Sequence, residues 1–230
     1  MTPYKHIFFD LDRTLWDFEK NSSDTLSEIL EEFSLYGIIS DKDDFIKVFN
    51  YYNERLWDFY RMGKIKKFIL RQERFRLVLN RYGIKNHELV ARVSKYYLDK
   101  NPLKTNLITD SKETLEYLSG KYKLYIISNG FYDVQVTKLI NSSISKYFTK
   151  IFTSDRIGHA KPDINIFEYA VRSLHAHKEE CIMIGDDETK DIMGAKNAKI
   201  DQVYFNPNNI PINVQPTFEI RSLIELKKLL

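Results

Sequence analysis

The chain has 230 residues, which allows one large domain or one domain with a sizeable insertion. Its hydrophobic fraction is 43%, with 15 Tyr and 15 Phe, so it can bury a substantial core and disorder is not the default expectation. The 35 basic residues nearly balance the 32 acidic ones, so the net charge of +3 does not favour binding to a nucleic-acid polymer.

Five short apolar runs, rich in Ile, Val, Phe and Tyr, predict buried strands. In chain order they are HIFFDLD, KLYIISNG, KIFTSD, ECIMIGDD and QVYFNP. Four of them end on a polar residue of a functional type, namely Asp10, Ser128, Asp155 and Asp186. Helical patterns separate most of the runs, as in Asp163–Leu174. This alternation predicts an α/β fold with a Rossmann-like parallel sheet, helices on both faces, and ligands at the carboxyl ends of the strands.

The segment between the first two predicted strands is far longer than a crossover helix requires. Apolar residues recur three and four positions apart in four stretches, and Gly37 suits a C-terminal cap for the first of them. The stretches are 23–36, 44–60, 70–82 and 88–98. We therefore expect residues 17–100 to form an inserted helical domain, and residues 1–16 and 101–230 to form the α/β core domain.

The segment DLDRT, residues 10–14, follows the first predicted strand. On an extended backbone, residues i and i+2 point the same way, so we expect the carboxylates of Asp10 and Asp12 to converge. Their protonation would then be coupled, with one carboxyl able to hold a proton. This suits a division of labour between a nucleophile and a general acid/base. A helix-capping cluster after a buried strand accounts for the pattern equally well.

A second acidic segment, GDDETKD, follows the predicted strand 181–184. Gly185 allows a tight turn, and Asp186, Asp187 and Asp191 carry up to three more negative charges. If the two strand ends are adjacent, the cluster of aspartates needs a cation, and hard oxygen ligands favour Mg²⁺. The alternative is an acidic turn on a solvated helix.

Two further motifs are SNG at 128–130 and AKPD at 160–163. The Ser128 hydroxyl and the backbone N–H groups of a glycine turn suit phosphate oxygens, although the same triplet is an ordinary turn signal. Pro162 fits the first turn of the following helix, which would place Lys161 at the helix entrance, within reach of the acidic cluster. A lysine before a proline is otherwise a common surface residue.

In this order, DLDRT, SNG, AKP and GDDETKD resemble the four motifs of the haloacid dehalogenase-like hydrolase superfamily. The resemblance covers nearly the whole chain, and the helical insert is similar to the cap domain of that family. The carboxylate of Asp12 indicates the phosphatase branch, because the dehalogenase branch has no leaving alkoxide to protonate. Two positions depart from the pattern: Arg13 stands where Gly is most common, and Asp187 where a smaller polar residue is common.

The resemblance implies a phosphatase that uses Mg²⁺ and an aspartyl-phosphate intermediate. Asp10 would be the nucleophile, and Asp12 would protonate the leaving oxygen and later activate water. Lys161 would neutralise charge. The implied phosphate-binding residues are Thr14, Ser128, Asn129, Gly130 and Lys161. The implied metal ligands are Asp10, Asp12 through its main-chain carbonyl, Asp186, and Asp187 or Asp191.

A narrower resemblance, in NERLWDFYRMGKI, SNGF, KPDINIFEYA and PTFEIRSLIELKKLL, is to YjjG-type pyrimidine nucleotide 5′-nucleotidases. It implies a nucleoside 5′-monophosphate as the substrate. The candidates for closing over a nucleoside are Trp16, Phe18, Arg55, Lys64 and Phe131, each of which also fits the core or the surface. The alternatives are a sugar-phosphate or broad small-molecule phosphatase, a phosphomutase of the superfamily, and a non-enzymatic binding protein for a phosphate ligand.

Three negative features point to the compartment. The single cysteine, Cys181, cannot form an intramolecular disulfide and fits reducing conditions. The N-terminal segment lacks a long apolar signal core, and no run reaches the ~18 apolar residues of a membrane span. We therefore expect a cytoplasmic protein that does not bind membranes.

Overall fold

The chain folds as two compact units in the computed structural model, which describes residues 4–230. One unit joins the N-terminal segment through Phe18 with Thr105–Leu230, and the other is Glu19–Lys104. The insert therefore comprises Glu19–Lys104, whereas the sequence analysis predicted residues 17–100.

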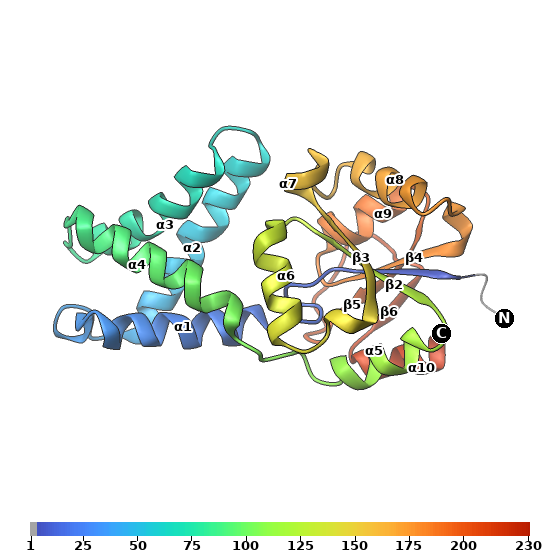
Figure 1. The fold of residues 1–230 in the computed structure, drawn as a ribbon, viewed down its shortest axis with the longest axis horizontal. Helices are drawn as coiled ribbons and strands as arrows, with labels where there is room; N and C mark the ends of the chain where they lie inside the picture. The colour runs from blue at the N-terminus through green and yellow to red at the C-terminus, as the bar shows by residue number, and fades with distance from the viewer. Residues whose placement is uncertain (1–3) are drawn as a thin grey trace. The chain divides into compact units, whose positions relative to one another are not determined.

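The centre of the larger unit is a parallel sheet with the strand order β3-β2-β1-β4-β5-β6 (Figure 1). The strands are β1 (His6–Phe9), β2 (Lys123–Ser128), β3 (Phe148–Thr153), β4 (Cys181–Gly185), β5 (Asp201–Phe205) and β6 (Phe218–Ile220). The predicted Rossmann-like sheet is thus confirmed, with the five predicted strands present. The sixth strand was not predicted, because its three residues are too short to show a period.

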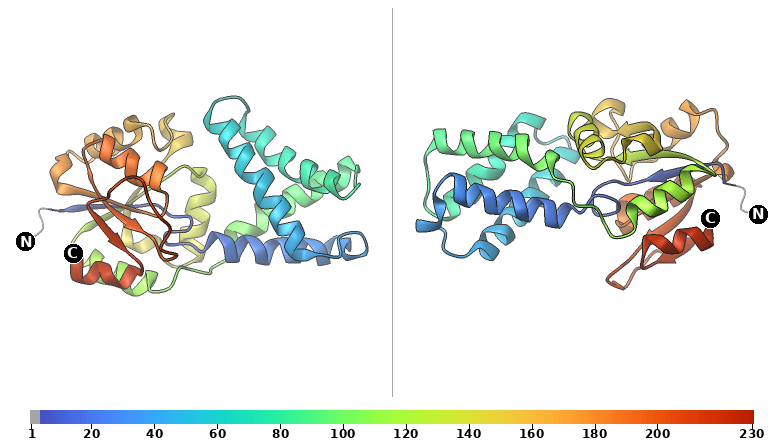
Figure 2. Two further views of the ribbon diagram at one scale, coloured as in Figure 1. Left: turned by 180° about the vertical axis from the view of Figure 1, so that it is seen from behind. Right: turned by 60° about the horizontal axis from the view of Figure 1, so that its bottom comes forward.

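Helices cover both faces of this sheet (Figures 1 and 2). They are α5 (Ser111–Ser119), α6 (Tyr132–Asn141), α7 (Ser154–Ile157), α8 (Ile164–Ser173), α9 (Gly194–Asn197), α10 (Leu226–Leu229) and the π-helical segment Glu188–Met193. Short 3₁₀ turns lie at Leu35–Gly37, Asn101–Leu103, Ser145–Tyr147, Lys178–Glu180 and Leu223–Glu225. None of the helices within residues 4–230 is long and apolar enough to cross a lipid bilayer.

The alternation of side chains along β1 assigns the helices to the two faces. Ile7 and Phe9 pack in a core with apolar residues of α5, α6 and α10, whereas Phe8 packs in a second core with α8 and α9. All three side chains are fully buried, as expected for a strand covered on both faces. Because β1 lies between β2 and β4, the loops that follow these three strands emerge side by side.

Helix α8 begins later than the sequence indicated. Its N-cap is Asp163, whose carboxylate accepts a hydrogen bond from the N–H of Asn165 at 2.9 Å. Pro162 therefore precedes the cap, and the prediction that it lies in the first helical turn is wrong. An aspartate that can accept from the first free N–H groups defines the start more strongly than the proline does.

The smaller unit consists of the four predicted helices, α1 (Phe18–Glu32), α2 (Lys42–Arg61), α3 (Lys67–Arg81) and α4 (His87–Lys100). Helix α1 begins five residues before the predicted Ser23, because its first turns bury polar residues that give no apolar period. The hydroxyl of Ser22, for example, lies 3.0 Å from that of Tyr97. Gly37 lies in a separate 3₁₀ turn and does not cap α1. The prediction that it would cap this helix is therefore wrong.

The smaller unit has its own core, with an aromatic cluster at its centre. The rings of Phe49, Phe75 and Tyr97 lie 5.1–5.3 Å apart between centroids. The buried guanidinium of Arg74 lies 4.6 Å from the Tyr97 ring and donates a hydrogen bond to Asn53. Three aromatic faces thus surround a buried cation, which they stabilise through their quadrupoles.

We expect Phe49→Ala to lower the free energy of unfolding by about 3–5 kcal/mol, because it removes a fully buried ring from this cluster. Phe59→Ala on the same helix is the matched control: this ring is 37% exposed, so its loss should change stability by no more than about 0.5 kcal/mol. Urea unfolding followed by circular dichroism measures both. Equal effects of the two substitutions would contradict the packing described.

Candidate active site

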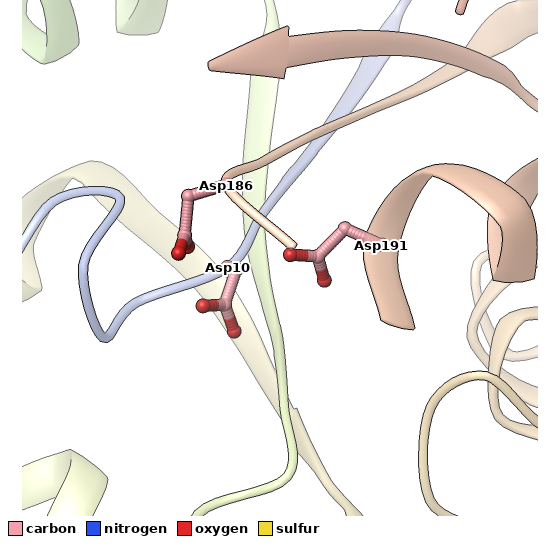
Figure 3. A group of neighbouring side chains, drawn as sticks. All are labelled: Asp10, Asp186 and Asp191. Atoms are coloured by element: carbon pink, nitrogen blue, oxygen red, sulfur yellow. The ribbon is translucent and has the colours of Figure 1, made fainter. Parts of the chain in front are cut away.

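Three carboxylates gather at the carboxyl ends of β1 and β4 (Figure 3). Asp10 follows β1 and its N–H donates to the carbonyl of Ile184 at 2.9 Å. Asp186 follows β4, and Asp191 lies in the π-helical segment. One carboxylate oxygen of each lies within 4.8 Å of the others. The sequence predicted this group, but the adjacency of β1 and β4 is what assembles it.

Lys161 joins two of these carboxylates. Its Nζ lies 2.6 Å from Asp10 Oδ1 and 2.6 Å from Asp191 Oδ1, and its side chain is only 2% exposed. Asn129 fixes the backbone at this position, because its Oδ1 accepts from the N–H of Lys161 at 2.7 Å and its Nδ2 donates to the Lys161 carbonyl at 2.9 Å. Lys161 is therefore a buried residue of the cluster, which excludes the alternative that it is an ordinary surface lysine.

Burial dominates the electrostatics of the cluster. It raises the pKa of Asp10, against the opposing charge of Lys161. It also raises the pKa of Asp186 to about 7, with the charge of Asp10 acting in the same direction, and that of Asp191 to about 8. Burial works against the charge of Lys161, but the two carboxylates outweigh it and raise the Lys161 pKa. Lys161 contacts two of the three carboxyl groups, so an excess of negative charge remains when all three ionise.

These residues fit a divalent cation. Three hard carboxylate oxygens in one small space suit Mg²⁺ in type, and a cation would offset the charge that Lys161 leaves uncompensated. Asp187 is not part of the group: its carboxylate accepts from the N–H groups of Thr189 and Lys190 and pairs with the Lys190 ammonium. Of the two alternatives from the sequence, the structure brings Asp191 to the cluster and uses Asp187 as a helix cap.

Asp12 is not one of the three clustered carboxylates, but it lies near enough to Asp10 for its charge to raise the Asp10 pKa. The strand ends at Phe9, and Arg13 in the following loop has a φ of 69°, a left-handed conformation that glycine adopts at no steric cost. The carboxylate of Asp12 reaches α6, where Lys138 pairs with Oδ1 and Gln135 Nε2 donates to Oδ2 at 2.9 Å. Each of the two acids thus has its own lysine.

The predicted phosphate-binding residues divide into two groups. Ser128 Oγ accepts from the N–H of Gly130 at 3.1 Å and from Gln135 Nε2 at 2.6 Å, which leaves its own proton to donate. By contrast, the buried hydroxyl of Thr14 donates to Asp186 at 2.7 Å, and the Asn129 side chain is committed to Lys161. Ser128 and Lys161 therefore remain the candidates for direct phosphate contact, whereas Thr14 and Asn129 orient their neighbours.

Two glycines allow neighbouring side chains to approach the backbone closely. A Cβ on Gly130 would lie 2.4 Å from Gln135 Nε2, and a Cβ on Gly185 would lie 2.3 Å from Asp191 Oδ2. Both distances are too short for any real contact. The two positions therefore keep Gln135 and Asp191 in place because they carry no side chain.

The sequence analysis missed Gln135 and Lys138. Both are buried, at 0% and 4% exposure, and lie three positions apart on the face of α6 that also buries Leu139. Two polar residues on an apolar helix face directly after SNG were the available signal. Their partner could not be inferred, because Asp12 is more than a hundred residues away in the chain.

The residues predicted to contact a nucleoside lie in two kinds of environment, buried in the larger unit or exposed on the insert. Trp16 and Phe131 are buried, with exposures of 0% and 4%. Both side chains are therefore packed inside the fold and are not available for the predicted contact with a base. Phe18 is partly buried next to Trp16. On the insert, Arg55 donates to the Tyr51 hydroxyl at 2.6 Å and Lys64 lies 5.7 Å from the Phe59 ring, both at the surface of that unit.

The fold and the cluster together define a Rossmann-like hydrolase with an inserted helical unit. A family model for haloacid dehalogenase-like hydrolases matches residues 7–205. The chain belongs to the haloacid dehalogenase-like hydrolase family, which confirms the resemblance seen in its four motifs.

Known proteins of this family resemble the chain along nearly its whole length. Pyrimidine 5′-nucleotidase PynA of Streptococcus pneumoniae is 31% identical over 227 residues, covering 97% of this chain and 93% of PynA. Pyrimidine 5′-nucleotidase YjjG of Escherichia coli is 28% identical, covering 97% and 96%. The magnesium-bound crystal structure of the HAD-hydrolase YfnB from Bacillus subtilis matches with a TM-score of 0.87 at 28% identity, covering 98% of both chains. The chain is accordingly an enzyme of the phosphatase branch.

We expect the metal-free protein to lose stability as the pH rises from about 5 to about 8. The folded-state pKa values of Asp186 and Asp191, about 7 and about 8, lie above their usual 3.8, so the folded state binds more protons than the unfolded state in this window. The reverse trend would contradict the raised pKa values.

Added Mg²⁺ should raise the melting temperature more at about pH 8 than at about pH 5, because a cation binds the ionised carboxylates. Differential scanning fluorimetry with EDTA or Mg²⁺ measures both effects. Asp186→Asn is the control, since it should shrink the Mg²⁺ response.

Proposed function

We propose that this enzyme is a Mg²⁺-dependent phosphomonoesterase that hydrolyses nucleoside 5′-monophosphates, with pyrimidine nucleotides preferred. The observation that carries the proposal is the separation of the two acids of the first motif. Asp10 lies beside Lys161 in the carboxylate cluster, whereas Asp12 lies outside it with Lys138. Two carboxyl groups in different surroundings suit two different tasks.

In the first step, Asp10 attacks phosphorus, and Lys161 holds one of its two carboxylate oxygens. A bond forms between the other oxygen and phosphorus while the bond from phosphorus to the 5′-oxygen of the nucleoside breaks. Asp12 gives its proton to that leaving oxygen. In the second step, Asp12 takes a proton from water, whose oxygen displaces Asp10 from phosphorus and releases inorganic phosphate.

The phosphoryl oxygens need donors in both steps. The ammonium of Lys161 and the free proton of Ser128 supply them from two neighbouring segments of the site. Asp10, Asp186 and Asp191 would hold Mg²⁺, with the main-chain carbonyl of Asp12 as a further proposed ligand. When bound, the ion supplies positive charge to the transferring phosphoryl group.

Two observations support the nucleotide substrate. Both PynA and YjjG are named pyrimidine 5′-nucleotidases, and each aligns with nearly the whole chain, including the insert. The insert also carries exposed cationic and aromatic side chains, with Arg55 beside Tyr51 and Lys64 beside Phe59. Such pairs suit contact with a base and its sugar. The lone buried thiol of Cys181 fits a reducing compartment, so we propose a cytoplasmic location.

Phosphate release from a panel of nucleoside monophosphates and sugar phosphates tests this function. We expect release that depends on Mg²⁺, stops with EDTA, and has its highest kcat/KM on pyrimidine 5′-monophosphates. Asp10→Asn provides the blank, because it keeps the shape and removes the nucleophile. A maximum on sugar phosphates would keep the chemistry and reject the substrate. No release above the blank would favour a binding protein.

We expect Lys161→Ala to lower kcat by at least about 100-fold, the usual loss on removing a donor to a charged transition state. Lys178→Ala is the matched control, since Lys178 pairs at 3.0 Å with Glu168 at the surface of α8. Steady-state kinetics of the two variants, with melting curves to confirm folding, provide the comparison. Similar kinetics for both would remove Lys161 from the site.

A further inference from the structure

Asp12 is held by two buried residues of α6, Gln135 and Lys138, which we name the α6 pair. Lys138 pairs with Oδ1 of the carboxylate, and Gln135 Nε2 donates to Oδ2 at 2.9 Å. Both oxygens of Asp12 are therefore bound from one helix, by residues three positions apart on the same face. A carboxylate with both oxygens held has a single orientation.

The surroundings of Lys138 direct its charge to Asp12. Its side chain is 5% exposed, and its Nζ lies 4.1 Å from the ring centroid of the fully buried Trp16. An ammonium so far removed from water needs compensation, which the ring face and the carboxylate provide. Lys138 contacts both Asp12 and Trp16, so it cannot move away from Asp12 without losing both partners.

Gln135 connects Asp12 to the phosphate-binding part of the site. Its Nε2 also donates to Ser128 Oγ at 2.6 Å, so one amide sets the spacing between the acid and the hydroxyl. The amide turns its NH₂ towards Asp12, whose Oδ2 is the acceptor. Its buried Oε1 then has no hydrogen-bond partner within residues 4–230.

We propose that Gln135 and Lys138 are positioning residues that fix the carboxyl group of Asp12 for proton transfer to the leaving oxygen. This inference rests on the proposed function, in which Asp12 is the general acid. A general acid acts only within hydrogen-bond reach of the oxygen that it protonates, and small errors of placement are costly. Asp12 lies on a loop with 24% of its side chain exposed, so the α6 pair supplies the orientation that the loop does not.

The leaving group provides the test. A nucleoside 5′-oxygen must gain a proton as its bond to phosphorus breaks, whereas p-nitrophenolate leaves as a stable anion without one. The kcat/KM value covers the steps through departure of the leaving group. We expect Lys138→Met to lower kcat/KM on a pyrimidine 5′-monophosphate at least about 10-fold more than on p-nitrophenyl phosphate, as for loss of general acid catalysis. Gln135→Met should act in the same direction.

Three variants serve as controls. Lys146→Met removes an exposed lysine that also lies over a ring, Tyr147 at 5.0 Å, and should leave both substrates unchanged. Lys138→Arg keeps the charge and should recover part of the loss. In an Asp12→Asn background, Lys138→Met should add no further dependence on the leaving group, because its action runs through Asp12.

The outcomes separate this inference from the proposed function. Equal losses on both substrates for Lys138→Met and Gln135→Met would reduce the α6 pair to a structural role and overturn the inference, while leaving the phosphatase intact. Absence of Mg²⁺-dependent release by the wild-type enzyme from either substrate would overturn both. Melting curves identify any variant that fails to fold, in which case the ratio from the other member of the α6 pair decides.

Discussion

The burial of carboxylates beside a single lysine is the constraint on which the site depends. Asp10, Asp186 and Asp191 lie close together where water is largely excluded, so their charges repel and their pKa values rise. Lys161 offsets part of this repulsion, and much of the nearby structure serves to keep it there. Asn129 fixes its backbone, and the absence of a side chain on Gly185 lets Asp191 approach. The remaining negative charge makes this site suited to a divalent cation.

The same charge problem is solved differently for Asp12. It follows Asp10 by two residues and its charge raises the pKa of Asp10, but its own ionic partner is Lys138. In the proposed mechanism, Asp10 is the nucleophile and Asp12 exchanges protons, and each has its own lysine partner.

The insert is independent in its packing. Its four helices bury their own aromatic cluster around Arg74, and the sheet of the other unit buries two cores of its own. Surface residues of the insert such as Arg55 and Lys64 can therefore change without disturbing the cores that hold Asp10 and Lys161. This arrangement suits a family in which the chemistry stays the same while substrates differ.

The sequence by itself determined the parallel sheet, the helical insert and the identity of Asp10, Lys161 and Asp186 as site candidates. Apolar periods and short motifs at strand ends are local patterns, and these features depend on such patterns. Only the tertiary structure decided which of Asp187 and Asp191 joins the cluster, where the carboxylate of Asp12 points, and that Gln135 and Lys138 hold it. These contacts join residues from separate segments, and their geometry depends on strand order and on the placement of α6 beside the Asp12 loop. A linear sequence carries no direct record of either.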